Sequence, residues 1–405
     1  MDQRLTIRLI FLLHALATGS MLTRIPDIQA GLGIDAGVLG LCLLGQPAGA
    51  IFIFLTSSRL IEAVGTRLVL LVGIPLAAIL IVLMPLAPSP LLLFAIFAIY
   101  GMAFSLSNVA MNVEADRVEA STAHRLMNSC HGIWSVGQLA TVSAGAAMRG
   151  LSVPAVWHFG AIAPVIVVAA LVVILPMREA RARAHTRTGP QRVLSLPTVM
   201  TLLLVGYAIG AAICEGAVRN WSIIFMRDSF AAPEWVDGLS LMFFVGATVA
   251  GRLVADGLTT RFGPVRLART LGAVSLVGLV AVVLSPVVPV ALIGFAAIGI
   301  GVCVSYPLST SAAARLGDRP ASENVAAMTM TTQITLLGAP ALLGWVADVF
   351  GVRAIYLLVI PVVLMALWLA RYLGTKDAVV GASGEPPPTG FAGSPSPEGT
   401  EGLHS

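Results

Sequence analysis

Twelve long apolar segments occupy most of this 405-residue chain. A membrane-spanning helix needs about 20 consecutive, mostly apolar residues, and none of these segments shows the alternating pattern of an outer-membrane barrel. Only 11% of the residues are charged, whereas soluble proteins carry roughly 25%. A soluble globular domain is therefore excluded. The sequence predicts an all-α integral membrane protein with twelve transmembrane helices.

The expected spans follow from the apolar runs and from the Gly, Pro and charged residues between them. The first run resembles a signal peptide, but it is long and has no cleavage site, so we interpret it as the first span. The spans are expected at residues 5–23, 36–55, 68–86, 91–113, 126–148, 153–176, 198–218, 236–258, 267–284, 287–313, 325–346 and 353–373.

The distribution of basic residues predicts the orientation. With the N-terminus in the cytoplasm, 19 of the 24 Lys and Arg residues lie on the cytoplasmic side. Cytoplasmic loops of membrane proteins carry an excess of Lys and Arg. We therefore expect a multi-pass protein of the plasma (inner) membrane with both termini cytoplasmic. The five outward residues are Arg24, Arg149, Arg219, Arg227 and Arg353.

The two halves of the chain repeat each other. The basic loop at 58–67 follows the second span, and a similar loop at 256–266 follows the eighth span, about 198 positions later. The predicted organisation is a six-helix half over 1–176, a cytoplasmic linker over 177–196, a second six-helix half over 197–373 and a disordered cytoplasmic tail over 374–405. Two repeated halves with a substrate site between them are typical of secondary transporters.

Uncharged polar side chains form stripes on the fourth and fifth spans. Spacings of three and four residues place each set on one helix face. Hydrocarbon offers such groups no partners, so the stripes should face a neighbouring helix or a watery cavity. The residues are Ser105, Asn108 and Asn112 on the fourth span and Asn128, His131, Ser135 and Gln138 on the fifth.

Several short motifs resemble a known transporter family. The loop after the second span keeps Gly65 and Arg67 of the basic loop motif of the major facilitator superfamily, with Glu62 at its acidic position. Further motifs resemble the YbjJ-type branch, which is related to fucose-permease-like sugar:proton symporters: 24–27 (RIPD), 108–114 (NVAMNVE), 131–137 (HGIWSVG), 215–216 (EG) and 221–222 (WS). The resemblance implies a secondary transporter of the MFS fold and no particular sugar.

Glu215 is the one acidic residue well inside an apolar segment. Since an unpaired carboxylate in hydrocarbon is costly, it should be protonated, paired or solvated. It is a candidate proton carrier or substrate acceptor, or else part of a structural pair near the outer surface. Arg24 is a candidate partner, and we hypothesise that Arg24 and Glu215 meet as a gate near the extracellular mouth.

The remaining candidates for the substrate or proton site are a histidine, amides and aromatics. His131 suits proton traffic because imidazole titrates near neutral pH, while His14 is interpreted as structural. Asn108, Asn112 and Gln138 can donate and accept hydrogen bonds to a polar solute, or can link helices. Trp134 and Trp221 could stack on a substrate, although Trp221 also suits the interfacial aromatic belt.

Other residues are expected at the cytoplasmic hinges or in the core. The hinge candidates are Glu62, Gly65, Arg67, Glu114, Asp256 and Arg261, with Glu114 expected to pair with Arg117 or Arg125. The four cysteines, Cys42, Cys130, Cys214 and Cys303, lack metal-site spacing and are interpreted as buried thiols.

The resulting functional prediction is a transporter that moves a small polar solute, such as a sugar or related metabolite, by alternating access with proton coupling. We expect a monomer in contact with membrane lipid, with no cofactor, no metal and no nucleic-acid partner. No GxxxxGK[ST] motif is present, so ATP hydrolysis is not the expected energy source, and no catalytic constellation suggests an enzyme. The alternatives are an efflux pump for amphipathic compounds and a non-transporting receptor.

Overall fold

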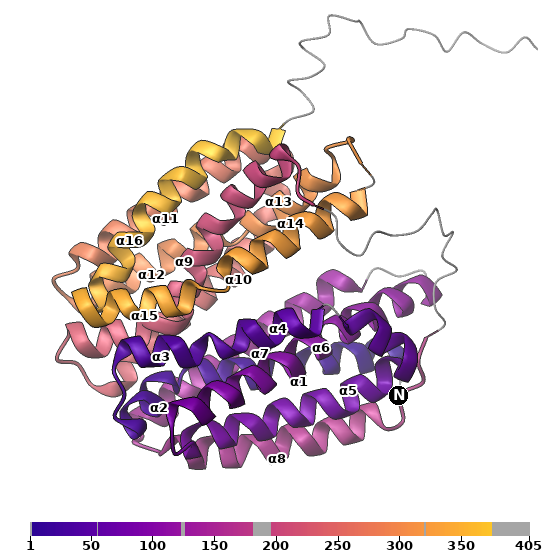
Figure 1. The fold of residues 1–405 in the computed structure, drawn as a ribbon, viewed down its shortest axis with the longest axis horizontal. Helices are drawn as coiled ribbons and strands as arrows, with labels where there is room; N and C mark the ends of the chain where they lie inside the picture. Colours follow the sequence, from indigo (N-terminus) through magenta and orange to yellow (C-terminus); the bar gives the residue numbers. More distant parts are fainter. Residues whose placement is uncertain (1, 55, 123–125, 181–195, 320, 375–405) are drawn as a thin grey trace, which may run out of the picture.

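The computed structural model describes residues 2–54, 56–122, 126–180, 196–319 and 321–374. All regular structure in these ranges is helical, which confirms the predicted class (Figure 1). Within the described residues, eleven spans are long and apolar enough to cross a membrane. The twelfth, α7 (Met127–Gly150), is 24 residues long, or about 36 Å at 1.5 Å per residue. It falls short of the other spans in hydropathy because it carries the polar stripe.

The first half of the chain forms one helical bundle. Its elements are α1 (Gln3–Leu22), α2 (Ile25–Leu32), α3 (Ala36–Leu43), α4 (Gly45–Phe54), α5 (Ser57–Leu83), η1 (Met84–Leu86), α6 (Pro90–Thr122), α7 and α8 (Ala155–Ile174).

The second half forms a matching bundle. Its elements are α9 (Val199–Ser229), α10 (Glu234–Phe262), α11 (Pro264–Leu284), α12 (Val288–Val302), α13 (Ser305–Ala314), α14 (Ala321–Leu336), α15 (Ala339–Phe350), α16 (Val352–Leu369) and η2 (Ala370–Gly374). Most of the predicted linker and the predicted tail lie outside the described residues.

Several predicted spans consist of two shorter helices. Breaks separate α3 from α4, α12 from α13 and α14 from α15, and a similar break separates α1, which fills the predicted first span, from α2, which follows it. A proline lies among the first three residues of each second helix: Pro26, Pro47, Pro307 and Pro340. Proline is tolerated at a helix start because the first N–H groups have no intrahelical acceptor. Gly338 is the N-cap of α15 and keeps a right-handed helical backbone conformation.

Two predicted helix ends are wrong. The seventh span was expected to end at residue 218, but α9 continues to Ser229. The fourth was expected to end at 113, but α6 continues to Thr122. In α9, Arg219 stays inside the helix, where it pairs with Glu215 one turn earlier, and residues 221–226 beyond it are buried in the protein.

The basic loops repeat in backbone conformation as well as in sequence. Gly65 has φ 84° and ψ 159°, and Gly263, which lies 198 positions later, has φ 77° and ψ 158°. Only glycine adopts this region readily, since it has no Cβ. Gly65 kinks α5 and Gly263 lies between α10 and α11, at corresponding places in the two halves, so Arg67 and Arg266 come just after equivalent turns.

The halves meet mainly at one end of the molecule. We call it the contact end; it carries the α2–α3 and α15–α16 connections. The opposite, terminal end carries the start of α1 and the end of α16 (Figure 1). One apolar core runs through both halves at the contact end, where Leu39 and Val142 join Leu343 and Leu241. Toward the terminal end, each half has a core of its own.

Two helix pairs, α3–α15 and α7–α10, make most of the contacts between the halves. Small residues allow the close approach. A Cβ placed on Gly40 would lie 2.5 Å from the Pro340 carbonyl oxygen, and one on Gly238 would lie 2.5 Å from the Ala146 Cβ. The backbones therefore touch where any larger side chain would hold them apart.

Candidate functional site

A charged pair lies near the middle of α9, between the two halves. The Nε of Arg219 donates to the Oε1 of Glu215 at 2.8 Å. The Nη2 of Arg219 also donates to the Oε1 of Gln138 on α7 at 3.3 Å. The side chains of Arg219 and Glu215 keep 19% and 30% of their surface exposed. A paired yet solvent-reachable carboxylate inside an apolar helix is a candidate functional group.

A second guanidinium faces the same region from α10. Arg252 is exposed, and its Nε donates to the Cys303 carbonyl oxygen at 3.3 Å. Its charge acts on Glu215 of α9 and on His131 of α7, the two helices that α10 packs against. His131 is exposed on α7 and packs edge-on against Phe11, with 5.3 Å between ring centroids.

Gln138 has an unused hydrogen-bond donor. Its side chain is 2% exposed, and its Nε2 has no hydrogen-bond partner. A buried amide normally satisfies both of its polar atoms, because each unpaired group costs the full desolvation penalty. His131 and Gln138 are seven residues apart on α7 and thus face the second half together. The stripe predicted on the fifth span therefore does approach charged partners.

The hypothesised contact between Arg24 and Glu215 is wrong in this structure. Arg24 is 2% exposed and caps the start of α2 within the first half. It donates to Asp27 at 2.6 Å, to the Nδ1 of His158 at 3.1 Å and to the Val153 carbonyl oxygen at 2.9 Å. Glu215 has its partner on its own helix instead, which leaves the two residues in separate networks.

The Arg24 network extends across the contact between the halves. Arg149 at the end of α7 lies 3.1 Å from Asp27 and 3.7 Å from Asp237 on α10. Arg149 and Asp237 are 3% and 2% exposed. From the sequence, Arg149 was expected on the outer side, and Asp237 was not a candidate. The pattern of apolar residues does not show which charged side chains meet in three dimensions. These residues form a buried chain of alternating charges at the contact end.

Two candidate residues are fixed by packing within the first half. The Nε1 of Trp134 donates to the Nδ1 of His14 at 3.2 Å, and the Nε2 of His14 is 3.0 Å from the Phe104 carbonyl oxygen. Since Nδ1 accepts, Nε2 carries the proton and donates to Phe104. His14 is thus a neutral structural group, as interpreted from sequence, and Trp134 serves to orient it.

Trp221 is not placed for either of its predicted roles. It is fully buried in the core shared by the halves, away from a substrate surface and from the lipid interface. Asn108 and Asn112 are partly buried on α6, where the Nδ2 of Asn112 donates to the Asn108 carbonyl oxygen at 2.8 Å. Their described hydrogen bonds therefore stay within one helix.

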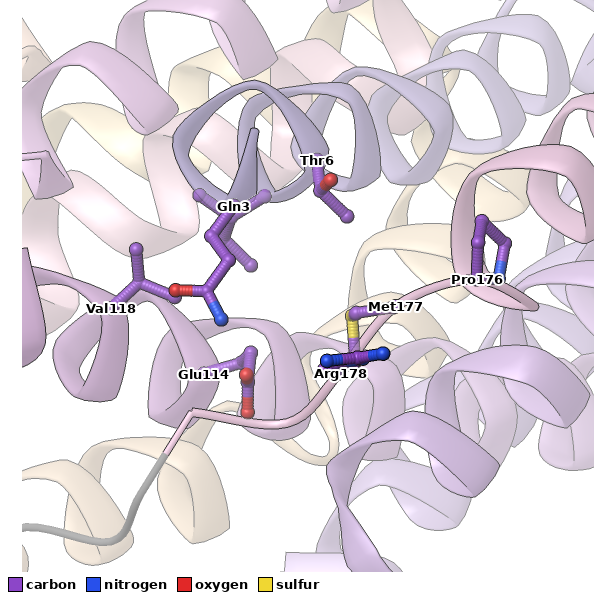
Figure 2. A pocket seen from close by; sticks show the side chains of 8 residues that line it. Gln3, Thr6, Glu114, Val118, Pro176, Met177 and Arg178 are labelled. Atoms are coloured by element: carbon purple, nitrogen blue, oxygen red, sulfur yellow. The ribbon is translucent and has the colours of Figure 1, made fainter. Parts of the chain in front are cut away.

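Glu114 joins three elements at the terminal end. Its carboxylate accepts from the Oγ1 of Thr66 and from the Ala180 N–H, both at 2.7 Å, and lies 3.8 Å from Arg117. The predicted pairing with Arg117 is therefore present, although it is secondary. Figure 2 shows Glu114 and Arg178 on the wall of a polar pocket of about 410 Å³ inside the first half.

The other hinge candidates differ in their surroundings. Arg67 donates its N–H to Glu179 at 2.8 Å and its guanidinium to the Ile174 and Leu175 carbonyl oxygens, so it ties the Gly65 turn to the end of α8. Glu62 is exposed, and Arg261 lies over the Phe262 ring. The side chain of Asp256 lies outside the described residues.

The four cysteines are buried free thiols, as predicted. Over the ranges described, no group of His, Cys, Asp and Glu is arranged to hold a metal ion.

Comparison with known proteins identifies the family. A sequence model described as Major Facilitator Superfamily matches residues 8–334. The chain belongs to the major facilitator superfamily. It is therefore a multi-pass membrane transporter for a small-molecule substrate and not an enzyme.

Curated relatives span nearly the whole chain. The uncharacterized transporter y4wD of Sinorhizobium fredii is 27% identical over 351 residues, covering 86% of this chain and 92% of that protein. An uncharacterized MFS-type transporter of Yersinia pestis is 24% identical over 365 residues, covering 89% and 94%. The membrane protein MosC of Rhizobium meliloti is 22% identical over 355 residues, covering 87% and 85%.

Solved structures confirm the MFS fold. A single-site mutant of the nucleoside transporter NupG aligns with a TM-score of 0.75 at 12% identity, covering 92% of this chain and 100% of that chain. A D-xylose–proton symporter aligns with a TM-score of 0.69 at 12% identity, covering 92% and 96%. At this identity the likeness concerns the fold alone.

Proposed function

We propose that this superfamily member is a proton-coupled transporter that carries a small polar solute by alternating access, within the YbjJ-type branch. The supporting observation is the bridge from Glu215 through Arg219 to Gln138, which joins the halves with partly exposed charged groups. Solute and coupling ion of such transporters bind between the halves near mid-membrane. The protein works as a monomer in the plasma membrane.

Glu215 is the proposed proton carrier. The groups that act on its carboxylate are Arg219 on the same helix and Arg252 on α10, and the Cys214 thiol is its sequence neighbour. When Glu215 gains a proton, it loses the charge that holds Arg219. The guanidinium then becomes available to the solute. Proton binding and solute binding thus use the same arginine, which couples them.

Alternating access follows from the uneven contact between the halves. The shared core and the buried charges at the contact end close that side. The positive-inside bias places the contact end outside the cell and the terminal end, with both termini, in the cytoplasm. The structure then corresponds to a state that faces the cytoplasm, and rocking of the halves about the Arg219 region opens the other side.

The deciding experiment is transport by proteoliposomes that contain the purified protein. A panel of sugars, sugar acids and other small metabolites is tested with and without an inward proton gradient. For a carried solute, Glu215→Gln should abolish accumulation driven by the gradient and should keep exchange of labelled for unlabelled solute. The reason is that exchange requires binding and rocking but no net proton movement.

Glu234→Gln is the matched control, since Glu234 is exposed at the start of α10 and its replacement removes the same charge. Gradient-driven accumulation by Glu215→Gln at the wild-type level would refute the coupling role. Solute binding without flux in any condition would refute transport and favour a receptor. Flux of hydrophobic cations alone would favour efflux of amphipathic compounds.

A further inference from the structure

We infer that the transported solute is an organic anion whose carboxylate, or an equivalent acidic group, is held by Arg219 and Arg252. This inference rests on the proposed function and specifies its substrate class. The starting observation is that Arg219, paired with Glu215 on α9, reaches Gln138 of α7 across the halves, and that the exposed Arg252 lies on α10, which packs against both of these helices.

Among the described side chains at this place, positive charges outnumber negative ones. Arg219 is matched by Glu215, with which it forms a 2.8 Å salt bridge. Arg252 has no carboxylate of a described side chain within salt-bridge distance, and its hydrogen bond goes to the neutral Cys303 carbonyl group. Asp256 lies one turn further along α10 and is left out of this balance, because its side chain is not described. Charges inside a membrane protein pair with one another or serve a ligand.

The position of Arg252 suits a ligand better than a structural role. It is exposed although it lies within the apolar span of α10, and it acts across the interface on His131 of α7. By contrast, Arg149, which serves a structural role, is buried beside Asp27 and Asp237. A planar guanidinium with free N–H groups matches the two oxygens of a carboxylate.

A neutral donor lies beside the charged ones. The Nε2 of Gln138 is buried without a partner, while the Oε1 of the same amide accepts from Arg219. A carboxylate that displaces Glu215 from Arg219 would also come within reach of this amide. Gln138 could then donate to the acid, which would satisfy the polar atom that the present arrangement leaves unpaired.

The two arginines therefore offer an acid charge-assisted hydrogen bonds from one half, and Gln138 offers a neutral one from the other. A neutral sugar could use the amide but would leave Arg252 without a counter-charge. A cationic solute would meet the two guanidinium groups and be repelled by them. The arrangement thus favours solutes by their negative charge. The polar stripe on α7 offers hydrogen bonds to hydroxyl groups on the same solute.

The test uses solutes that share one carbon skeleton and differ in charge. Galactose, galacturonate and galactosamine form one set, glucose, glucuronate and glucosamine a second, and C3–C6 hydroxy acids a third. Binding is measured as ligand-dependent thermal stabilisation of the full-length protein in detergent, and transport is measured as flux into proteoliposomes. We expect at least one acid to bind at least tenfold more tightly than its neutral and cationic counterparts.

Variants of the two arginines locate the binding site. Arg252→Gln should weaken binding of that acid at least tenfold, and Arg252→Lys should restore part of it because the charge returns without the planar fork. Arg252 is exposed, so its replacement should not unfold the protein. Arg219→Gln is made together with Glu215→Gln, which removes the pair as a unit. Arg371→Gln is the charge-matched control, since Arg371 packs on Trp368 at the end of α16.

The outcomes separate the two proposals. Flux of a neutral or cationic solute that binds more tightly than every acid would overturn the anion inference and keep the transporter. Absence of binding or flux for all the acids would also overturn the inference. Acid binding that is unchanged in Arg252→Gln would overturn the assigned site. Absence of flux for every solute in the panel, neutral ones included, would refute the proposed function itself.

Discussion

Arg149 is the residue whose charge most directly joins the halves. It is almost fully buried between Asp27 of its own half and Asp237 of the other. Removing one member of a buried ion pair costs about 3–5 kcal/mol, because the other charge stays buried without a partner. We expect Arg149→Gln to lower the thermal unfolding temperature in detergent and to loosen the contact end. The loosening is measured as maleimide labelling of a cysteine introduced at Ala347, which is buried at this contact.

Asp237→Asn tests whether the effect comes from the pair. Each single variant should increase the labelling rate. The increase in the double variant Arg149→Gln/Asp237→Asn should be smaller than the sum of the two single increases. The four native cysteines are buried and should contribute little background. Additive effects of the two variants would contradict a direct pairing across the halves.

At the scale of helices, the approach of α3 to α15 determines how tightly the contact end closes. A side chain on Gly40 would clash with the backbone at Pro340 and Gly344. Gly40→Val should therefore push the two helices apart and favour the opposite transport state. Spin labels on the α2–α3 and α15–α16 connections should report a longer distance than in the wild type.

Gly31→Val is the matched control on α2. A Cβ at Gly31 meets nothing within 4 Å, so the same change of residue type should leave the measured distance as it is. If Gly40→Val also leaves the distance unchanged, the α3–α15 approach does not set the closure of this end.

For the whole molecule, alternating access requires the contact end to open in every cycle. A Cβ on Gly37 would lie 3.6 Å from the Asp348 Cβ on the other half, within the roughly 3.5–4.5 Å that disulfides span. The double variant Gly37→Cys/Asp348→Cys should form a disulfide under mild oxidation. Transport should then stop, and reduction should restore it, because the bond prevents the halves from rocking.

Each single cysteine variant serves as a control and should transport equally well with and without oxidant. Binding of the solute from the terminal end should persist in the cross-linked protein, since the Arg219 region is untouched. Undiminished transport with the disulfide fully formed would contradict alternating access about this contact.

The sequence by itself determined the class, the number of spans and the repeat of the halves. The length of the apolar segments reflects the thickness of the hydrocarbon core that each helix must cross. The turns at Gly65 and Gly263 depend on local backbone conformation. The sequence also made Glu215, His131 and Gln138 candidates, because polar groups in an apolar segment are costly wherever they lie.

Only the tertiary structure decided which charges pair. The i,i+4 spacing of Glu215 and Arg219 was visible in the sequence, but the predicted helix end at residue 218 separated them. Arg149 and Asp237 are 88 positions apart and meet only because α7 packs on α10. Trp221 illustrates the same limit, since burial depends on the neighbouring helices and not on the residue. Which charges pair across the halves depends on how the helices pack, and the contacts between distant helices are not visible in the local sequence pattern.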